Sequence, residues 1–533
     1  MHGRLLLQKI VPKPPVLVAH TTDGALNATT EFNIFEAEPL VDNSPSLSDA
    51  QMAQILELKA PNLPIRYWQA LNNNFPAKNK TCAKFPNLWD INFNNVFWQT
   101  LKTSNGTFYL YSAYYDNRTL VALKPVVRML GMINRVAPTI KTYCQFWFHG
   151  LAEPIFAKVF EYKFVWCTKW GNNKDGLFQP YMMSCQIPVG FRHLVPESVS
   201  LVERPCDMAV TNLRVIYNKP LNGDKGEFAV CVKGLDFLND DLSVRLVEWI
   251  ETLRHLGAEK IFLYELEVHP NITKVLNYYQ ERGIVEVTPI TLPGHQPNIP
   301  GLIHMYLKNK LTNKRQNELI PYNDCLYRNM YRYKYIVVLD TDEVIMPKGE
   351  NVLWKDLMDN VVRKALAVKP VERASYNARN VYFFDSDNSE SNSVHHHYKD
   401  IPQYMHMYQH VYRSKNYTKP GAFIKCFHNP ERVLTLHNHF PLACLGGACS
   451  SFPISTDDAQ LQHYRADCVK TLKKSCAEYK NGTIMDDTIW RHKNPVISRV
   501  TESLFNLGFF NAASGTGTGS RLARPPPSAV RRK

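Results

Sequence analysis

The sequence predicts an α/β protein in which a parallel β-sheet covered by helices follows a smaller β-rich domain. Three observations lead to this prediction. Strand-like and helix-like segments alternate from about residue 225 onward, which is typical of parallel strands joined by right-handed crossovers. Short aromatic and β-branched runs, broken by Asn, Gly and Pro, fill residues 66 to about 218. An acidic run, DTDE, directly follows a strand-like segment of the α/β part.

The chain before the α/β part divides into two segments. Residues 1–64 are polar and weakly periodic, so we expect a stem or linker with one short helix near Ser48–Lys59. Residues 65–220 are expected to form a β-rich, sandwich-like accessory domain, because runs such as Thr107–Tyr114 and Tyr143–His149 have strand composition. This domain contains no recognisable catalytic motif, and its aromatic residues are expected in its core.

The α/β domain is expected over residues 221–510, and a disordered basic tail over 511–533. Its first helix has apolar residues at three- and four-residue spacing from Leu242 to Leu256 and ends at Gly257. Further strands are expected at Phe228–Lys233, Lys260–Leu266, Ile284–Ile290, Asn380–Phe384, Phe423–Phe427 and Arg432–Leu436. Further helices are expected at Asn271–Arg282, Leu319–Met330 and Trp354–Val368.

The charge of the chain narrows the range of partners. The formal net charge is +14, and several of the basic residues lie in the C-terminal tail. They form no stripe with interleaved aromatic residues, as single-stranded nucleic acid needs, so we expect no nucleic-acid partner. An anionic ligand or a membrane surface is compatible with this charge.

Sequons and cysteines predict an oxidising compartment. Twelve cysteines are present, without the C-x-x-C spacing of a structural zinc site. The pairs Cys444/Cys449 and Cys468/Cys476 can close short loops, whereas Cys231 is either bridged or a buried free thiol. Four cysteines assigned to the β-rich domain allow two bridges: Cys82, Cys144, Cys167 and Cys185. Seven N-x-S/T sequons occur, at Asn27, Asn79, Asn105, Asn117, Asn271, Asn416 and Asn481.

The N-terminal sequence lacks the signal that entry into an oxidising compartment requires. No apolar run is long enough to span a bilayer, and MHGRLLLQKIVPKPPVLVAH is a poor signal peptide because its apolar run is short and broken by Pro. Either the chain lacks a natural N-terminal anchor, or it is cytosolic and the sequons are accidental. We favour the first interpretation, in which any contact with a membrane depends on the missing anchor.

The acidic run lies within Tyr331–Pro347, YRYKYIVVLDTDEVIMP. The apolar segment before Asp340 is β-branched and predicts a strand buried on both faces. Ligands of open α/β sheets bind at the carboxyl ends of strands, where Asp340, Asp342 and Glu343 are expected. Three carboxylates in four residues repel one another, and Mg²⁺ or Mn²⁺ would neutralise them and hold a diphosphate. The alternative is an acidic turn that caps the strand.

The run D-x-D after an apolar strand occurs in two chemistries. In haloacid-dehalogenase-like phosphatases it closes the first strand, but here at least three strands precede it. In GT-A glycosyltransferases it closes the fourth strand, as in this layout. There Asp342 would ligate the metal, while Asp340 would face the ribose or reach the metal through water. His439 or His437 would complete the metal shell, or the two histidines form an ordinary loop pair. The triplet His395 to His397 can also bind metal, although a solvent-facing loop is expected there.

Several segments together resemble glycosyltransferase family 92. They are YNDCLYRNMYRYKYIVVLDTDEVIMP, CVKGLDF, LVEWIETLRHLGAEKIFLYE, YSAYYDNR at Tyr111–Arg118, His437–Pro441 and His463-Tyr464-Arg465. The resemblance covers roughly residues 105 to 495. It implies a GT-A type nucleotide-diphospho-sugar transferase domain in a Golgi type II membrane protein. It also implies an inverting, Mn²⁺-dependent enzyme that transfers galactose in β-1,4 linkage from UDP-galactose to fucose on N-glycans.

Further site residues follow from this chemistry. Inversion needs a base for the acceptor hydroxyl, and Asp486 or Asp487 is the candidate, with Asp385 and Asp387 as alternatives. Asp324 lies on the helix before the acidic run, and Arg328, one turn later, is positioned to meet the donor phosphate. Both can instead be ordinary helix-surface residues. The contrasting hypothesis for the whole chain is a non-catalytic, lumenal or secreted glycan-binding protein on the same fold.

Overall fold

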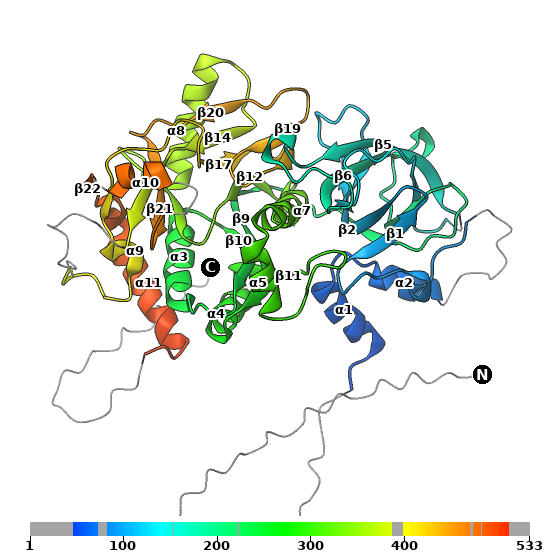
Figure 1. Cartoon of the computed structure of the whole chain (residues 1–533), viewed down its shortest axis with the longest axis horizontal. Coiled ribbons are helices and arrows are strands. Elements are labelled where there is room, and N and C mark those ends of the chain that lie inside the picture. Colours follow the sequence, from blue (N-terminus) through cyan, green and yellow to red (C-terminus); the bar gives the residue numbers. More distant parts are fainter. Residues whose placement is uncertain are drawn as a thin grey trace, which may run out of the picture. The chain divides into compact units, whose positions relative to one another are not determined.

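The computed structural model describes residues 46–510 apart from 73–82, 152, 221–222, 386–397, 469–472 and 481. Several predicted features lie outside the described residues: the stem before residue 46, the tail from 511, Asn27, Asn79, Cys82, Asp387, the triplet His395 to His397, and Asn481. Contacts divide the chain into Met1–Ser48 and Asp49–Lys533, and everything below concerns the second unit. Figure 1 shows its elements in order of sequence.

The second unit begins with two helices and an eight-stranded sheet. The helices are α1 (Asp49–Lys59) and α2 (Ile65–Asn72). The strands are β1 (Gln99–Thr103), β2 (Gly106–Asp116), β3 (Val126–Ile133), β4 (Tyr143–Trp147), β5 (Ile155–Phe164), β6 (Gln179–Gln186), β7 (Ser198–Val202) and β8 (Leu213–Ile216). Their order is β1-β2-β3-β6-β5-β4-β7-β8, and β8 also pairs with β2.

The pairing of β2 with β8 corrects the expected sandwich. It joins Ala113 to Val215 and Tyr114 to Ile216 in parallel, so the sheet closes on itself as a barrel. A sandwich has two separate facing sheets, whereas a closed sheet removes most of the exposed strand edges. The composition of the strands is the same in both architectures, because each needs one buried face. We call β1–β8 the barrel.

The α/β region has a seven-stranded sheet of order β11-β10-β9-β12-β17-β14-β20. Its strands are β9 (Gly226–Phe237), β10 (Lys260–Val268), β11 (Val285–Pro289), β12 (Tyr333–Val338), β14 (Ser375–Ala378), β17 (Lys425–His428) and β20 (Ser451–Pro453). The strands β11, β10, β9 and β12 run parallel, and β17 pairs with β12 antiparallel. The connecting helices are α3 (Ser243–Leu256), α4 (Pro270–Glu281), α5 (Leu302–Asn309), α6 (Leu311–Asn317) and α7 (Leu319–Asn329).

A second sheet of order β13-β21-β15-β16-β22 continues the α/β region. Its strands are β13 (Glu343–Pro347), β15 (Asn380–Phe384), β16 (Tyr412–Ser414), β21 (Ala459–Arg465) and β22 (Thr483–Met485). A separate hairpin pairs β18 (Val433–Leu436) with β19 (Pro441–Cys444). The remaining helices are α8 (Trp354–Val368), α9 (His406–Gln409), α10 (Lys473–Lys480) and α11 (Lys493–Asn506).

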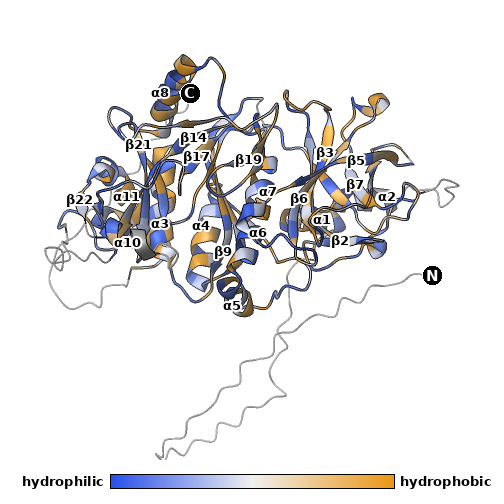
Figure 2. Cartoon of the chain, turned by 45° about the horizontal axis from the view of Figure 1, so that its top comes forward, coloured by the Kyte–Doolittle hydropathy of each residue, from blue (hydrophilic) through white to orange (hydrophobic). Residues whose placement is uncertain are grey.

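Both faces of the seven-stranded sheet are buried, as the apolar segment before Asp340 predicts. Successive side chains of β12 alternate between two cores: Val337 joins the core that contains α3, α4, α8 and α11, and Val338 joins the core that contains α7. The helix α8 shows the matching pattern, with an apolar stripe along one face and polar residues on the other (Figure 2). The second core also includes the barrel residues Tyr111 and Leu130, so the barrel packs over α7.

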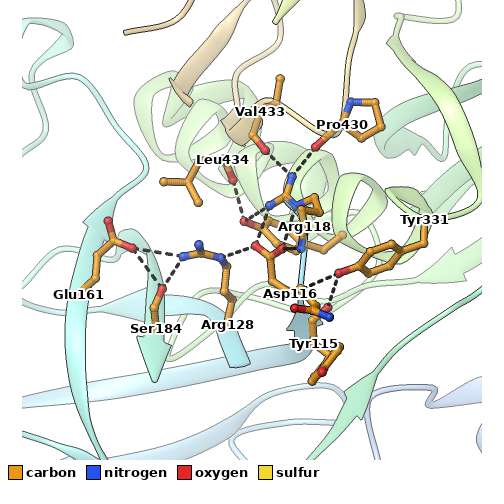
Figure 3. Close-up of polar contacts among 12 residues, drawn as sticks. Tyr115, Asp116, Arg118, Arg128, Glu161, Ser184, Tyr331, Pro430, Val433 and Leu434 are labelled. Carbon is orange, nitrogen blue, oxygen red and sulfur yellow. Dashed lines mark hydrogen bonds and ion pairs between the residues drawn. The ribbon is translucent and has the colours of Figure 1, made fainter. Parts of the chain in front are cut away.

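A buried ionic network joins the barrel to the α/β region (Figure 3). Arg118 follows β2, and its side chain is fully buried with that of Asp116. The guanidinium donates to both carboxylate oxygens of Asp116 at 2.8 Å, to the Val433 carbonyl at 2.6 Å and to the Pro430 carbonyl. Its last N–H reaches the hydroxyl of Tyr327 in α7 at 3.5 Å, so all five donors of Arg118 have acceptors.

Disulfide bridges connect four described pairs of cysteines. Cys444–Cys449 and Cys468–Cys476 confirm the two predicted short loops. Cys144–Cys185 lies within the barrel, and Cys231–Cys325 ties β9 to α7, so Cys231 is bridged rather than free. Such bridges are typical of lumenal or secreted proteins. In the part of the chain that the structure describes, no helix is both long enough and apolar enough to cross a membrane.

Candidate active site

The acidic run forms a tight turn between the two sheets of the α/β region. After β12, the amide of Leu339 still bonds to the Cys231 carbonyl at 3.2 Å, and the ladder then ends. The Glu343 amide donates to the Asp340 carbonyl at 3.1 Å, and the Glu343 carboxylate accepts from the Asp340 amide at 3.0 Å. This double closure fixes the turn and sets both aspartates at the carboxyl end of a parallel strand.

Two lysines compensate the charge of Asp340. The Nζ of Lys233, from β9, lies 2.9 Å from one carboxylate oxygen, and the Nζ of Lys425, from β17, lies 3.1 Å from the other. Burial would raise the pKa of Asp340, but these two ammonium groups hold it well below its ordinary value. Asp340 is therefore ionised, and two lysines compensate its charge. Binding of a metal ion by Asp340 stays a prediction.

The Glu343 side chain completes the inner part of the turn. It is buried and lies 2.9 Å from the Nζ of Lys425, which has no solvent exposure and also contacts Asn438. Burial raises the pKa of Glu343 above its ordinary value, with Lys425 opposing the shift. The two contacts of Lys425 with Asp340 and Glu343 make it the electrostatic anchor of the turn.

The side chain of Asp342, two residues after Asp340, is 44% exposed. Its described charged contact is with His463 of β21, whose Nε2 lies 3.4 Å away. Burial would raise the pKa of Asp342, but His463 holds it below its ordinary value. Burial would likewise lower the pKa of His463, but the carboxylates of Asp342 and Glu343 raise it. An ionised carboxylate and an imidazole thus meet at an accessible point.

A cleft of about 390 Å³ opens over Asp340 and Asp342. Its volume falls within the range of small-ligand sites. It is lined by the end of β9, the first turns of α3, the acidic turn, α9 and the end of β21, with Lys314 from α6. Four of the lining side chains are cationic: Lys233, Arg245, Lys314 and Arg465. The lining therefore combines two acids at its floor with several cations around them, a suitable arrangement for an anionic ligand and a divalent cation.

The residues fit a divalent cation at Asp342 rather than at Asp340. Asp342 offers an exposed carboxylate oxygen, the donor type that Mn²⁺ and Mg²⁺ sites completed by a diphosphate prefer, and an imidazole nitrogen lies beside it. Both oxygens of Asp340 already contact lysine ammonium groups, which repel a metal ion. The sequence predicts His439 or His437 as the histidine beside the metal, and in the structure His463 is the histidine beside Asp342.

The described lining of the cleft includes neither His437 nor His439. The His437 ring packs against Trp170 with centroids 4.6 Å apart, and burial lowers its pKa to about 4. The Nδ1 of His439 donates to the Ile424 carbonyl at 2.9 Å, and burial lowers its pKa to about 3. The charge of Asp340 opposes this lowering of the pKa, and a metal role for His439 stays a prediction.

Asp324 and Arg328 are buried beneath the barrel, not in the cleft. Arg328 donates to Asp324 at 2.6 Å, and the hydroxyls of Tyr264 and Tyr114 donate to the same carboxylate, the first at 2.6 Å. The cleft-lining residues include neither member of the pair. Their placement corrects the expectation of a contact with donor phosphate, because α7 is covered on a second side by the barrel.

The candidate bases are also placed away from the cleft floor. Asp486 is buried and bonded to Arg413 at 2.6 Å and to Gln460 at 3.0 Å, so its carboxylate is held within the fold. Asp487 is exposed beyond β22, and neither residue lines the cleft. Asp385, the remaining described alternative, lies behind the cleft wall and contacts His406, which does line it.

Several site residues were missed from the sequence. Lys425 and Arg245 come from a strand and a helix far from the acidic run in the sequence, and single basic residues give no local signal. Lys233 and His463 had a signal, because CVKGLDF and His463-Tyr464-Arg465 are among the segments that resemble family 92.

Comparisons with known proteins agree with this resemblance. Residues 226–499 match the family model described as Glycosyltransferase family 92. The matched region contains both sheets of the α/β region and the cleft described above. No curated protein matches the chain significantly. Among solved structures, the apo structure of the bifunctional glycosyltransferase WbbM is 13% identical, over 32% of this chain and 26% of that chain, with a TM-score of 0.18. A TM-score this low carries no structural conclusion.

Proposed function

This chain belongs to glycosyltransferase family 92, and from that premise we propose that it transfers a hexose from a UDP-sugar to a glycan acceptor in the cleft above Asp342. One observation carries the proposal. Asp342 and His463 present an ionised carboxylate and an imidazole to a cleft that also has four cationic side chains. The parallel order β11-β10-β9-β12, with the acids after β12, supports assignment to the GT-A type.

The cations of the cleft would bind the diphosphate of the donor. Lys233 is already held by Asp340, so its ammonium group needs no reorganisation when an anionic ligand enters. Arg245, Lys314 and Arg465 line the cleft around this point and would add attraction at longer range. In this proposal Asp340 positions Lys233 and reaches the ribose from the cleft floor.

We assign the metal, Mn²⁺ or Mg²⁺, to Asp342 and His463. Bound there, it would stabilise the negative charge that develops on the departing nucleotide. The protein's own contribution is to keep Asp342 ionised, through His463, and to keep the acidic turn rigid, through Lys425. Metal dependence and its ligand set are parts of the proposal.

Inversion at the sugar carbon requires a carboxylate that takes the proton of the acceptor hydroxyl. In place of Asp486 and Asp487 we propose Asp467, which lines the cleft just beyond β21. Its side chain is largely exposed, and its hydrogen bonds, above all that with Lys480, lower its pKa. It is therefore ionised and accessible to a bound acceptor.

The finer assignments come from the family resemblance alone. They are galactose as the transferred sugar, β-1,4 linkage, fucose on N-glycans as acceptor, and the Golgi lumen as location. The bridged cysteines support a lumenal or secreted protein in general.

A panel of UDP-sugars tests the proposal. The purified chain is incubated with each donor and Mn²⁺, with and without a fucosylated N-glycan, and UDP release and glycan mass are measured. We expect UDP-galactose to be consumed and the glycan mass to rise by one hexose. Absence of donor consumption throughout, with retained glycan binding, would favour the non-catalytic glycan-binding alternative.

A further inference from the structure

A second cluster of metal-ligating atoms lies behind the wall of the cleft. Asp385 follows β15, His406 is the first residue of α9, and His410 directly follows that helix. One ligand atom from each of the three residues falls within 4.8 Å of the others. The Nε2 of His406 is 2.9 Å from Oδ1 of Asp385, and the Nε2 of His410 is 3.9 Å from the same oxygen. Two imidazoles thus converge on a single carboxylate oxygen.

The tautomer of His410 shows which of its ring nitrogens is available to a metal ion. The Nδ1 of His410 lies 2.7 Å from the His406 carbonyl oxygen, which can only accept, so Nδ1 carries the hydrogen. In the neutral ring, Nε2 therefore has a lone pair, and it faces an oxygen of Asp385. A donor bond from the other ring nitrogen to a backbone carbonyl is how ligating histidines are usually oriented. A cation between Nε2 and Oδ1 would satisfy both lone pairs.

Among the residues that the structure describes, no lysine or arginine side chain pairs with Oδ1 of Asp385. Arg245 approaches the other oxygen, Oδ2 of Asp385, at 3.4 Å and leaves Oδ1 to the histidines. A hydrogen bond from His406 explains the 2.9 Å contact, but it leaves the Nε2 of His410 without a hydrogen-bond partner in the described part of the chain. The two distances to Oδ1 are compatible with ligands of one ion, since bonds of about 2.0–2.2 Å place ligand atoms at most about 4.4 Å apart.

The backbone that carries the histidines is held in place. The buried carboxyl of Glu248, from α3, accepts from the amides of Met407 at 2.8 Å and Tyr408 at 3.3 Å. These are amides of the first turn of α9, which otherwise lack partners. The side of the cluster away from Asp385 faces a pocket of about 330 Å³, lined by both histidines together with Arg245, Gln403 and Gln409. Water or a ligand can therefore reach an ion there.

We propose that Asp385, His406 and His410 bind a divalent transition-metal ion of the zinc class, with an open coordination position toward this pocket. Two imidazoles and one carboxylate are a ligand set of open zinc sites, and the i, i+4 spacing of the histidines suits one face of a helix. The ion would tie the end of β15 to α9, which forms part of the cleft wall. This site is separate from Asp342 and does not depend on the proposed transfer reaction.

Zinc titration of the full chain tests the proposal. The protein is stripped with EDTA, desalted and titrated with ZnCl₂ by calorimetry, and CoCl₂ is used in parallel to record visible absorption bands. We expect the wild type to bind one equivalent that His410→Ala loses or binds at least tenfold more weakly. Asp385→Asn should have the same effect, and it keeps the shape of the side chain if the histidine variant folds poorly.

Three controls make the result specific. Asp342→Asn should keep this equivalent, because its site is in the cleft. His304→Ala removes a histidine paired with a single carboxylate, Asp236, and should change nothing. A variant with Ala at residues 395–397 excludes binding by the histidine triplet. The proposal is overturned if the wild type binds no zinc outside the triplet, or if folded Asp385→Asn and His410→Ala bind zinc as the wild type does.

Discussion

Two clusters of buried charge, one around Arg118 and Asp116 and one at the acidic turn, differ in which polar groups they leave available to a ligand. Under the barrel, Arg118 uses all five donors, and both oxygens of Asp116 are bonded to guanidinium groups. At the tip of β12, Asp340 is equally compensated, but its neighbour Asp342 is 44% exposed and has a longer contact with His463. A cluster in which every polar group has a hydrogen-bond partner stabilises the fold. A cluster with an accessible carboxylate at a cleft can bind a ligand.

The comparison shows why acidic residues alone do not identify a site. Asp116, Asp324 and Asp340 all have cationic partners within hydrogen-bond distance. The difference lies in the neighbouring space: the cleft is lined by the acidic turn, whereas the barrel covers the other two carboxylates. Substitutions in the first cluster should therefore change stability, and substitutions in the second should change donor binding and turnover.

The largest effect is expected for Arg118→Ala. It leaves Asp116 buried beside a single guanidinium, and breaking a buried ion pair costs about 3–5 kcal/mol of unfolding free energy. Chemical denaturation measures the loss, and turnover per folded molecule should stay unchanged. The control Arg66→Ala removes an exposed ion pair with Glu57 and should cost only about 0–1 kcal/mol. Equal losses of unfolding free energy in the two variants would contradict a stabilising role for the buried network around Arg118 and Asp116.

Asp342→Asn should give the next effect, and it should be on catalysis. Loss of the exposed carboxylate should lower turnover of UDP-galactose by about 10²–10³-fold, the usual loss when one group that stabilises developing charge is removed. The melting temperature should change little, because the side chain is partly exposed. Asp359→Asn, on the exposed face of α8, is the matched control and should retain full turnover. Retained turnover in Asp342→Asn would remove this residue from the mechanism.

Tyr264→Phe sharpens the assignment of Asp324. It removes one hydrogen bond to a buried carboxylate, so we expect a loss of about 1–3 kcal/mol of unfolding free energy. The KM for the donor should not change, because Asp324 and Arg328 are away from the cleft. A raised KM at unchanged stability would restore the sequence-based expectation that this pair meets the donor.

Lys314→Ala should have the smallest effect. This side chain lines the cleft from α6, and a partly exposed charge contributes about 0.5–1 kcal/mol to binding of an anion. The KM for the donor should rise about two- to fivefold at low salt, with a smaller rise at high salt because the charge is screened. Steady-state kinetics at two ionic strengths measure both. An effect that is independent of salt would mean that Lys314 acts through packing.

Local patterns predicted most of the α/β elements. The helix α8 coincides with the predicted Trp354–Val368 and β15 with the predicted Asn380–Phe384, and β9, β10, β11 and α7 differ from expectation only at their ends. Their hydrophobic periodicity, and helix-ending residues such as Gly257 after α3, can be recognised within a short stretch of sequence. The closed barrel was not predicted, because closure depends on the pairing of β2 with β8 and not on the composition of either strand.

Of the site residues, the sequence predicted those that a short continuous motif identifies. Asp340 and Asp342 follow an apolar strand directly, so their position at its tip was visible in the sequence. Lys233, Lys425 and His463 reach the turn from other strands, and only the tertiary fold brings them there. Asp324 and Arg328 have the spacing of helix-surface residues, but every residue of α7 is buried. The second covering layer, the barrel, was not evident in the periodicity of α7.

The binding of UDP with and without Mn²⁺ tests the central claim most directly. Calorimetric titrations of UDP would compare the wild type, Asp342→Asn and Tyr264→Phe, each shown to be folded by its melting curve. We predict that Mn²⁺ tightens UDP binding at least tenfold in the wild type and in Tyr264→Phe, and not in Asp342→Asn. The same Mn²⁺-dependent gain in Asp342→Asn would contradict the claim that this exposed carboxylate in the cleft holds the metal and, through it, the nucleotide.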